Sequence, residues 1–124
     1  MYPNLFAGRC VMKKKIDLLP GTLDLMVLRT LQSMGAQHGY GIARRIEQVS
    51  GNQVLLNQGT IYAALVRLQQ HRWISARWGV SDNNRRAKFY EISSRGQKKL
   101  AEDSDAWWRL AGVIEAILGP QESS

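Results

Sequence analysis

The residues of this chain that could take part in chemistry are mostly arginines and lysines. The 124 residues include 17 Lys and Arg against 10 Asp and Glu, which gives a formal net charge of +7. A surplus of this kind favours polyanionic partners, either nucleic acid or an anionic membrane surface. The single cysteine, Cys10, cannot form an internal disulfide, so we expect a reducing, cytoplasmic compartment.

Catalytic and metal-binding patterns are not visible in the sequence. His38 and His71 stand far apart, and with one distant cysteine they do not make a zinc set. No Ser/His/Asp constellation, phosphate loop or carboxylate pair is present, so we expect no enzymatic activity, no cofactor and no metal. No run approaches the roughly 18 apolar residues of a membrane span. The last helix carries few cations beyond Lys99 and Arg109, so we expect no membrane partner.

The most informative segment is NQGTIYAALVRLQQHRWI, residues 57–74. Asn57 is a favourable helix N-cap. At about 100° per residue, four side chains form one apolar face: Ile61, Ala64, Leu65 and Leu68. The outward face is small at its start, at Gly59 and Thr60, and basic at its end, at Arg67, with no acidic neighbour in the sequence. A helix that needed only solubility would more often carry Glu and Lys there.

A first helix should precede this segment. Pro20-Gly21-Thr22 predicts its entry, and Gly35 its end. Its apolar stripe is Leu23, Val27 and Leu31, and two further leucines extend the stripe round the other side: Leu25 and Leu28. A helix that is apolar on most of its circumference is buried on two sides. We therefore expect this helix to lie between its own domain and another surface, and we assign Leu25 and Leu28 to dimerisation.

A second helix is predicted at about residues 41–50. Gly51 is suited to cap its C-terminal end. Three side chains are expected to face inward: Ile42, Ile46 and Val49. Arg44 and Arg45 should lie on its solvated face, where a phosphate contact is an alternative.

A β-hairpin is predicted after the informative segment. The runs 73–80 and 85–93 are rich in aromatic and β-branched residues, and the Ser-Asp-Asn-Asn sequence at 81–84 suits the turn between them. Three cations without acidic partners lie on or near the tip: Arg85, Arg86 and Lys88. They favour contact with phosphates, whereas a merely soluble hairpin tip is the alternative.

The last helix is predicted from Ser94 to about Leu118, before Gly119-Pro120. From Trp107 onward its apolar residues nearly follow the heptad spacing of a coiled coil. We expect the apolar residues of this helix to form a dimer interface: Leu100, Trp107, Leu110, Ala111, Ile114, Ile117 and Leu118. Trp107 and Trp108 are about 100° apart on a helix and cannot share a face. Trp108 should therefore meet the first helix or a groove at the dimer centre.

Three short helices followed by a hairpin is the order of a winged helix-turn-helix, a mainly α fold with a small β-hairpin (α+β). In that motif the later helix of the pair enters the major groove with its N-terminal residues at the base edges. Small residues permit close approach there, and backbone N–H groups can bind a phosphate. The residues expected to contact DNA are Tyr40, Gln58, Gly59, Thr60, Tyr62, Arg67, Arg85, Arg86 and Lys88.

Four ordered motifs also resemble one known family. The segments LLPGTLDLMVLRTL, HGYGIARRI, GTIYAALVRL and RRAKFYEISSRG are similar, in this order, to the PadR family of transcriptional regulators. The resemblance implies a homodimeric repressor of double-stranded DNA with a roughly palindromic operator, and dimerisation through the C-terminal helix. The single short C-terminal helix is like that of the smaller branch of the family. Some members bind flat hydrophobic effectors near aromatic residues, so Trp108 is a candidate effector contact, although packing is the preferred interpretation.

Individual positions carry the resemblance further. Gly39-Tyr40-Gly41 matches the motif that opens the second helix, Thr60 and Tyr62 match the recognition-helix pair, and residues 85–88 match the basic wing. Two departures stand out. Ala63 occupies a position where members often have Arg or Pro. Arg72-Trp73 replaces the usual Gly-Leu before the first wing strand. Because of these two departures, the operator sequence cannot be inferred from those of relatives.

Four regions are expected along the chain: a flexible basic arm at 1–16, a winged helix-turn-helix domain at 17–93, a dimerisation helix at 94–119, and a tail at 120–124. Met12 precedes three lysines, and we expect it to be the natural start. The function expected is sequence-specific binding to double-stranded DNA as a homodimeric repressor released by a signal. The alternative is a winged-helix protein-interaction module that binds no operator.

Overall fold

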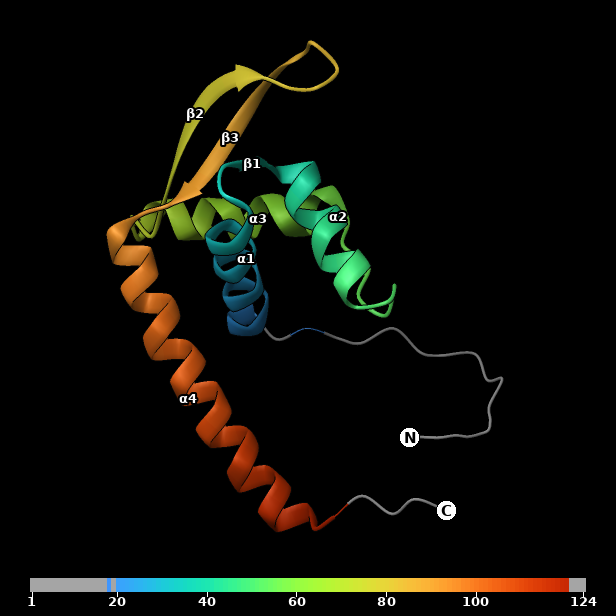
Figure 1. Cartoon of the computed structure of the whole chain (residues 1–124), viewed down its shortest axis with the longest axis vertical. Coiled ribbons are helices and arrows are strands. Elements are labelled where there is room, and N and C mark those ends of the chain that lie inside the picture. Colours follow the sequence, from blue (N-terminus) through green and yellow to red (C-terminus); the bar gives the residue numbers. More distant parts are fainter. Residues whose placement is uncertain (1–17, 19, 121–124) are drawn as a thin grey trace.

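The structure is a computed structural model that describes residues 18 and 20–120 of the chain. The elements in order are α1 (Pro20–Met34), β1 (Gln37–His38), α2 (Gly39–Val49), α3 (Gln58–Gln70), β2 (Ile74–Val80), β3 (Arg86–Ile92) and α4 (Ser94–Leu118). Three helices form a body from which the hairpin projects at one end, and α4 runs away in the other direction (Figure 1). The predicted fold class is confirmed, whereas the expected N-terminal arm and Met12 lie outside the described residues.

The sheet has three antiparallel strands in the order β1-β3-β2. The hairpin register runs from Ile74 opposite Ile92 to Val80 opposite Arg86. β1 adds a two-residue edge in which Gln37 lies opposite Tyr90. This third strand was not predicted, because two residues are too short to show a period-two pattern.

The core lies between the helices and the base of the hairpin. The predicted inward face of α3 is confirmed, since Ile61, Ala64, Leu65 and Leu68 are each at most 4% exposed. The predicted stripe of α1 is also buried: Leu23, Val27 and Leu31. Val49 of α2 was expected to face inward but is 71% exposed. α2 ends at this residue, and Val54 of the following connector is buried at 4% exposure.

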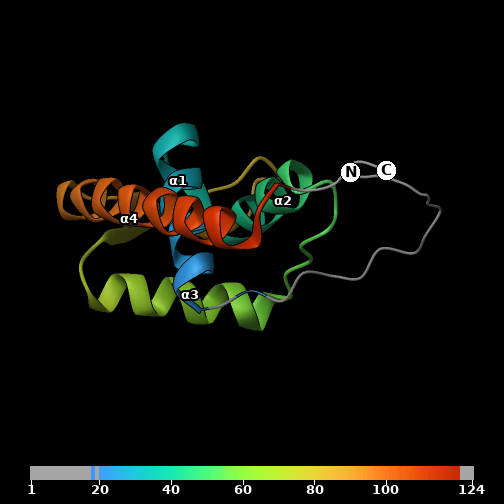
Figure 2. The same cartoon turned by 90° about the horizontal axis from the view of Figure 1, so that it is seen from below.

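Two of the predicted dimerisation residues belong to this core. Leu28 of α1 is 1% exposed and Leu100 of α4 is 3% exposed, both within a single chain. The expectation that α1 is buried on two sides is correct, but the chain itself provides both sides. α1 contacts α2, α3, β3 and α4, and Figure 2 shows it crossing α4. Leu28 and Leu100 therefore stabilise the monomer fold and are not available to a second copy.

The end of α3 is closed by a left-handed turn at an arginine. The N–H of Trp73 donates to the carbonyl of Leu68 at 3.0 Å, and the N–H of Arg72 donates to the carbonyl of Gln69 at 2.9 Å. This is the Schellman pattern, in which the residue after the helix cap is usually glycine. Arg72 occupies that place with φ +63°, whereas Gly51, the predicted cap of α2, fills the matching place there with φ +65°.

Replacing Arg72 by glycine is expected to raise the free energy of unfolding by about 0.5–1 kcal/mol, because a side chain in the left-handed region is strained and glycine is not. Chemical denaturation at fixed protein concentration measures this change. Arg72→Ala is the control, since it removes the same charge but leaves a Cβ at the strained position. An equal gain in both variants would show that the charge of Arg72, and not its backbone, is the source.

Candidate nucleic-acid interface

A surface hollow of about 1010 Å³ lies between the start of α2, the start of α3 and the hairpin. Seven of the nine residues expected to contact DNA line it: Tyr40, Gln58, Gly59, Tyr62, Arg85, Arg86 and Lys88. They come from three elements that are separated in sequence. Thr60 and Arg67 are not among its lining residues. The fold therefore gathers most of the predicted contacts on one concave surface.

The start of α3 is exposed and capped as predicted. Asn57 precedes the helix in extended backbone conformation, and its Oδ1 accepts a hydrogen bond from the N–H of Thr60 at 2.8 Å. Gln58, Gly59 and Thr60 are all exposed. The N-terminal end of a helix carries partial positive charge and unpaired N–H groups, which attract phosphate. No acidic side chain lies in the first turn of α3 to compete with such an anion.

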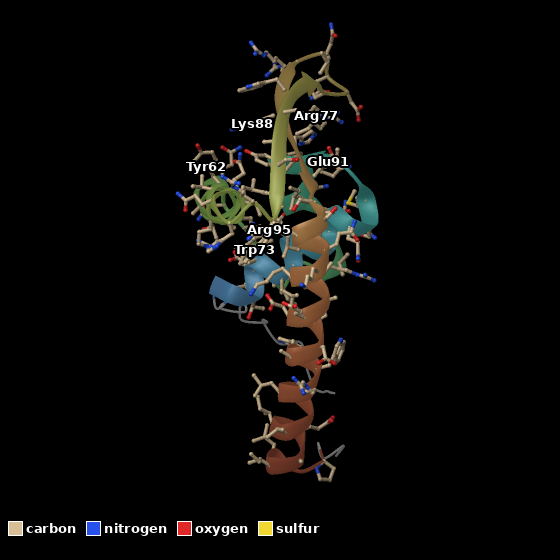
Figure 3. All side chains as sticks on the ribbon, turned by 90° about the vertical axis from the view of Figure 1, so that its left-hand side faces the viewer. Tyr62, Trp73, Arg77, Lys88, Glu91 and Arg95 are labelled. Atoms are coloured by element: carbon tan, nitrogen blue, oxygen red, sulfur yellow. The ribbon has the colours of Figure 1, made fainter. Side chains whose placement is uncertain are left out.

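Two exposed tyrosines stand on either side of the hollow. Tyr40 at the start of α2 is 65% exposed, and Tyr62 on α3 is 60% exposed. Figure 3 shows Tyr62 on α3. Tyr90 of β3 also lines the hollow but is buried at 4% exposure. Burial raises the pKa of Tyr90, and the electrostatic interaction with Tyr62 raises it further. The exposed phenolic hydroxyl groups of Tyr40 and Tyr62 can donate hydrogen bonds to phosphate oxygens.

The hairpin contributes the strongest positive charge. Arg85, Arg86 and Lys88 line the hollow, and none of them forms an ion pair with a carboxylate in the described part of the chain. Lys88 lies on the side of the hairpin that faces α3, whereas Arg77 lies on the opposite side (Figure 3). Asp82 is the acidic residue among the lining residues. The hollow therefore carries a net positive charge and suits a polyanion.

Arg67 differs from the sequence expectation. Its Nη2 atom donates to Oδ1 of Asp24 on α1 at 2.7 Å, and its Nε atom lies 3.4 Å from Oδ2 of the same carboxylate. The hydrogen bond to Asp24 raises the pKa of Arg67. The sequence has no acidic residue close to Arg67, but α1 crosses α3 at this point and brings Asp24 beside it. Arg67 therefore links α3 to α1, and it is not among the residues that line the hollow.

Two further residues of the hollow, His38 and Arg44, were not among the expected DNA contacts. His38 caps α2, since its Nδ1 atom accepts a hydrogen bond from the N–H of Gly41 at 3.0 Å, and its ring stacks beside Tyr40. Histidine is not among the usual N-cap residues, so the sequence did not predict that His38 caps α2. Arg44, for which the sequence left a phosphate contact as an alternative to a solvated face, lines the hollow as well. It lies four residues after Tyr40 on the same helix face, a spacing that could have placed it there.

The C-terminal part of α4, residues 107–118, is called its outer half and presents an apolar face. Six of the predicted dimerisation residues fall within an arc of about 120° at about 100° per residue: Trp107, Leu110, Ala111, Ile114, Ile117 and Leu118. Ile117 and Leu118 are 77% and 78% exposed. Trp107 and Trp108 meet edge to face at 4.9 Å, and both line a groove of about 890 Å³ with residues of α1 and α2, including Leu25.

Comparison with solved structures shows the same architecture in other regulators. A PadR family transcription regulator from Clostridium difficile is 26% identical, covers 78% of this chain and 98% of its own, and has a TM-score of 0.67. A transcriptional regulator from Clostridium thermocellum is 24% identical, covers 80% and 95%, and has a TM-score of 0.72. These likenesses, together with the hairpin and the capped third helix, define a winged-helix protein of the transcription-regulator class.

The sequence comparisons assign the family. Residues 27–102 match the transcriptional regulator PadR-like family, and the chain belongs to it. A protein from Lysinibacillus sphaericus that is named "Uncharacterized protein X" is 31% identical over 103 residues, which is 82% of this chain and 93% of that protein. The resemblance found in the sequence is confirmed. Because the family consists of transcription regulators and not of enzymes, the expectation of no enzymatic activity is also confirmed.

None of the helices that the structure describes is long and apolar enough to cross a membrane. Within residues 18 and 20–120, no three His, Cys, Asp or Glu side chains come close enough together to hold a metal ion.

Proposed function

We propose that this chain is a homodimeric repressor that binds a roughly palindromic operator in double-stranded DNA. The observation that carries the proposal is the hollow, which joins the exposed start of α3, two tyrosines and three hairpin cations on one concave surface. In a winged helix-turn-helix, the start of this helix reads base edges and the wing contacts the backbone. Gln58 and Thr60 are the polar side chains at that start, and the wing cations are placed to neutralise phosphates.

Footprinting on the DNA upstream of the chain's own gene tests the proposal. A repressor dimer should protect two half-sites related by a two-fold axis, with centres about 34 Å or one helical turn apart. A single protected half-site would contradict the dimeric arrangement. Protection that follows no sequence would contradict an operator.

Dimerisation is proposed to occur through the outer half of α4. A contiguous exposed apolar surface of this kind marks an interaction site, and a helical seam is suited to a second copy of itself. Burying Ile117, Ile114 and Leu118 in the dimer would remove apolar area that the monomer leaves in water. Leu25 lies at the inner edge of this region, in the groove beside Trp107.

Replacing Ile117 by glutamate is expected to shift the protein from dimer to monomer, because a charge would be buried in the apolar seam. Mass measurement by light scattering during gel filtration reports the change. Ala116→Glu is the matched control, since the neighbouring residue is exposed on the other side of α4. Dissociation by both substitutions, or by neither, would place the interface elsewhere.

The signal that releases the operator is proposed to act at the groove between α4, α1 and α2. A flat hydrophobic ligand seated against Trp107 and Trp108 would favour one angle between α4 and the winged domain, and so one operator affinity. Packing of the two indoles in the dimer is the competing role. Tryptophan emission that changes with a compound lowering operator affinity supports the ligand role. Emission that changes only with protein concentration supports packing.

A further inference from the structure

Trp78 on β2 is an exposed tryptophan in the hairpin, and the interface described above does not use it. Its side chain is 59% exposed, and it is not part of the core or of the residues packed against the core. The hairpin projects from the helical body (Figure 1), and Trp78 lies within its strand β2. Val80, two residues further on, is 67% exposed. An apolar patch therefore lies on the projecting part of the hairpin.

The strand register places Trp78 on the interface side. Trp78 lies directly opposite Lys88, and cross-strand partners point to the same face of a sheet. Tyr90 follows on this face, because side chains alternate along a strand. Both Lys88 and Tyr90 line the hollow. Trp78 therefore faces the side of the hairpin that carries the proposed DNA contacts, while Arg77 faces away (Figure 3).

Trp78 also holds one of the wing cations. The guanidinium carbon of Arg86 lies 4.7 Å from the centroid of the indole ring. Arg86 is the cross-strand partner of Val80 and thus the diagonal neighbour of Trp78 on the same face. Stacking on an aromatic face restricts the guanidinium to a few orientations while leaving its N–H donors free at the edge. Arg86 is thereby positioned before any phosphate arrives.

An aromatic ring interleaved with unpaired cations is typical of surfaces that bind nucleic acid. On single strands, aromatic side chains stack on bases while neighbouring cations meet phosphates. In a duplex the base faces are covered by their neighbours, so the deoxyribose is the apolar group that such a ring can reach. We propose that Trp78 and Arg86 act as one stacked unit on DNA, in which the guanidinium contacts a phosphate and the indole packs on the adjoining deoxyribose. This inference rests on the proposed function, since it assumes that the hairpin side of the hollow meets DNA.

Operator binding by a set of variants tests the stacked unit. Trp78→Ala is expected to weaken binding about 5- to 10-fold, and Trp78→Phe less than about 3-fold because a ring remains under Arg86. Arg86→Ala should weaken binding and also reduce the slope of log K against log salt by about 1. The double variant Trp78→Ala/Arg86→Ala should bind no more than about 2-fold more weakly than Arg86→Ala, since the two residues act together.

The matched control is Arg77→Ala, on the same strand and the opposite face, which should change the affinity by less than about 2-fold. A second readout does not depend on affinity. DNA should quench the tryptophan emission of the wild type more than that of Trp78→Phe, because only the wild type carries an indole at the contact. Thermal unfolding of each variant verifies that the hairpin is intact, and Trp78→Phe serves if Trp78→Ala fails to fold.

The outcomes separate this inference from the proposed function. Wild-type protein that binds no duplex overturns both. A wild type that binds its operator, with Trp78→Ala binding equally well, overturns the stacked unit alone. Losses from Trp78→Ala and Arg86→Ala that simply multiply also overturn it, as does equal quenching in the wild type and Trp78→Phe.

Discussion

Replacing Arg85, Arg86 and Lys88 together by alanine is expected to abolish specific DNA binding at physiological salt. Each cation that neutralises a phosphate contributes about −0.9 to the slope of log K against log salt, so the slope should become shallower by about 2–3. At about 0.15 M salt we expect an affinity loss of roughly 100-fold or more. The three side chains line the hollow and pair with no carboxylate among residues 18 and 20–120, so their charge is available to DNA.

A second triple variant separates the effect of where the cations lie from the effect of the net charge. Arg95, Lys98 and Arg109 lie on α4, away from the hollow, and their replacement by alanine lowers the formal charge by the same amount, from +7 to +4. This variant should keep nearly all of the affinity and most of the salt slope. If the two triple variants lose affinity equally, the protein binds DNA through its overall charge and the hollow has no special role.

Gly96→Ala is expected to have the largest effect on stability. A Cβ at this position would lie 2.0 Å from the backbone oxygen of Trp73 and 2.8 Å from Cγ1 of Ile92. The first turn of α4 thus packs directly on the backbone that enters β2, and a backbone atom cannot move aside as a flexible side chain can. We expect the free energy of unfolding to fall by about 3 kcal/mol or more, and the melting temperature by at least about 10 °C.

Gly112→Ala is the control for this substitution. Gly112 also lies within α4, and a Cβ there would meet nothing within 4 Å. Alanine at that exposed helical position should stabilise the protein by up to about 1 kcal/mol. Both variants must be compared at the same protein concentration, because the proposed dimerisation would make the melting temperature depend on concentration. A Gly96→Ala protein as stable as the wild type would show that α4 can shift away from Trp73.

Local signals in the sequence predicted most of the fold. The apolar face of α3, its N-cap at Asn57 and the left-handed cap at Gly51 each depend on a few neighbouring residues, and the structure has all of them. β1 was missed because two residues carry no periodicity. Leu28 and Leu100 were assigned to a dimer because periodicity shows that a face is buried but not which surface buries it. Only the crossing of α1 and α4 decides that.

The candidate site was harder to predict where it depends on tertiary distances. The ion pair of Arg67 joins residues 43 positions apart, and the crossing of α1 over α3 creates it. Trp78 was overlooked because the face of a strand residue is known only once the register of the hairpin is known. Tyr40, Tyr62 and the wing cations were predicted from the order of the sequence motifs, which needs no tertiary distance, and the structure places all of them on the hollow.

The central claim is that the hollow is the surface of a sequence-specific DNA-binding regulator. Fluorescence anisotropy of a labelled duplex from the region upstream of the gene, across a salt series and beside an unrelated duplex, tests it most directly. Our account predicts tight binding to the upstream duplex, a clear preference over the unrelated one, and a steep fall of affinity with salt. Equal weak binding to both would point to a winged-helix interaction module. Binding to neither at low salt would contradict the account.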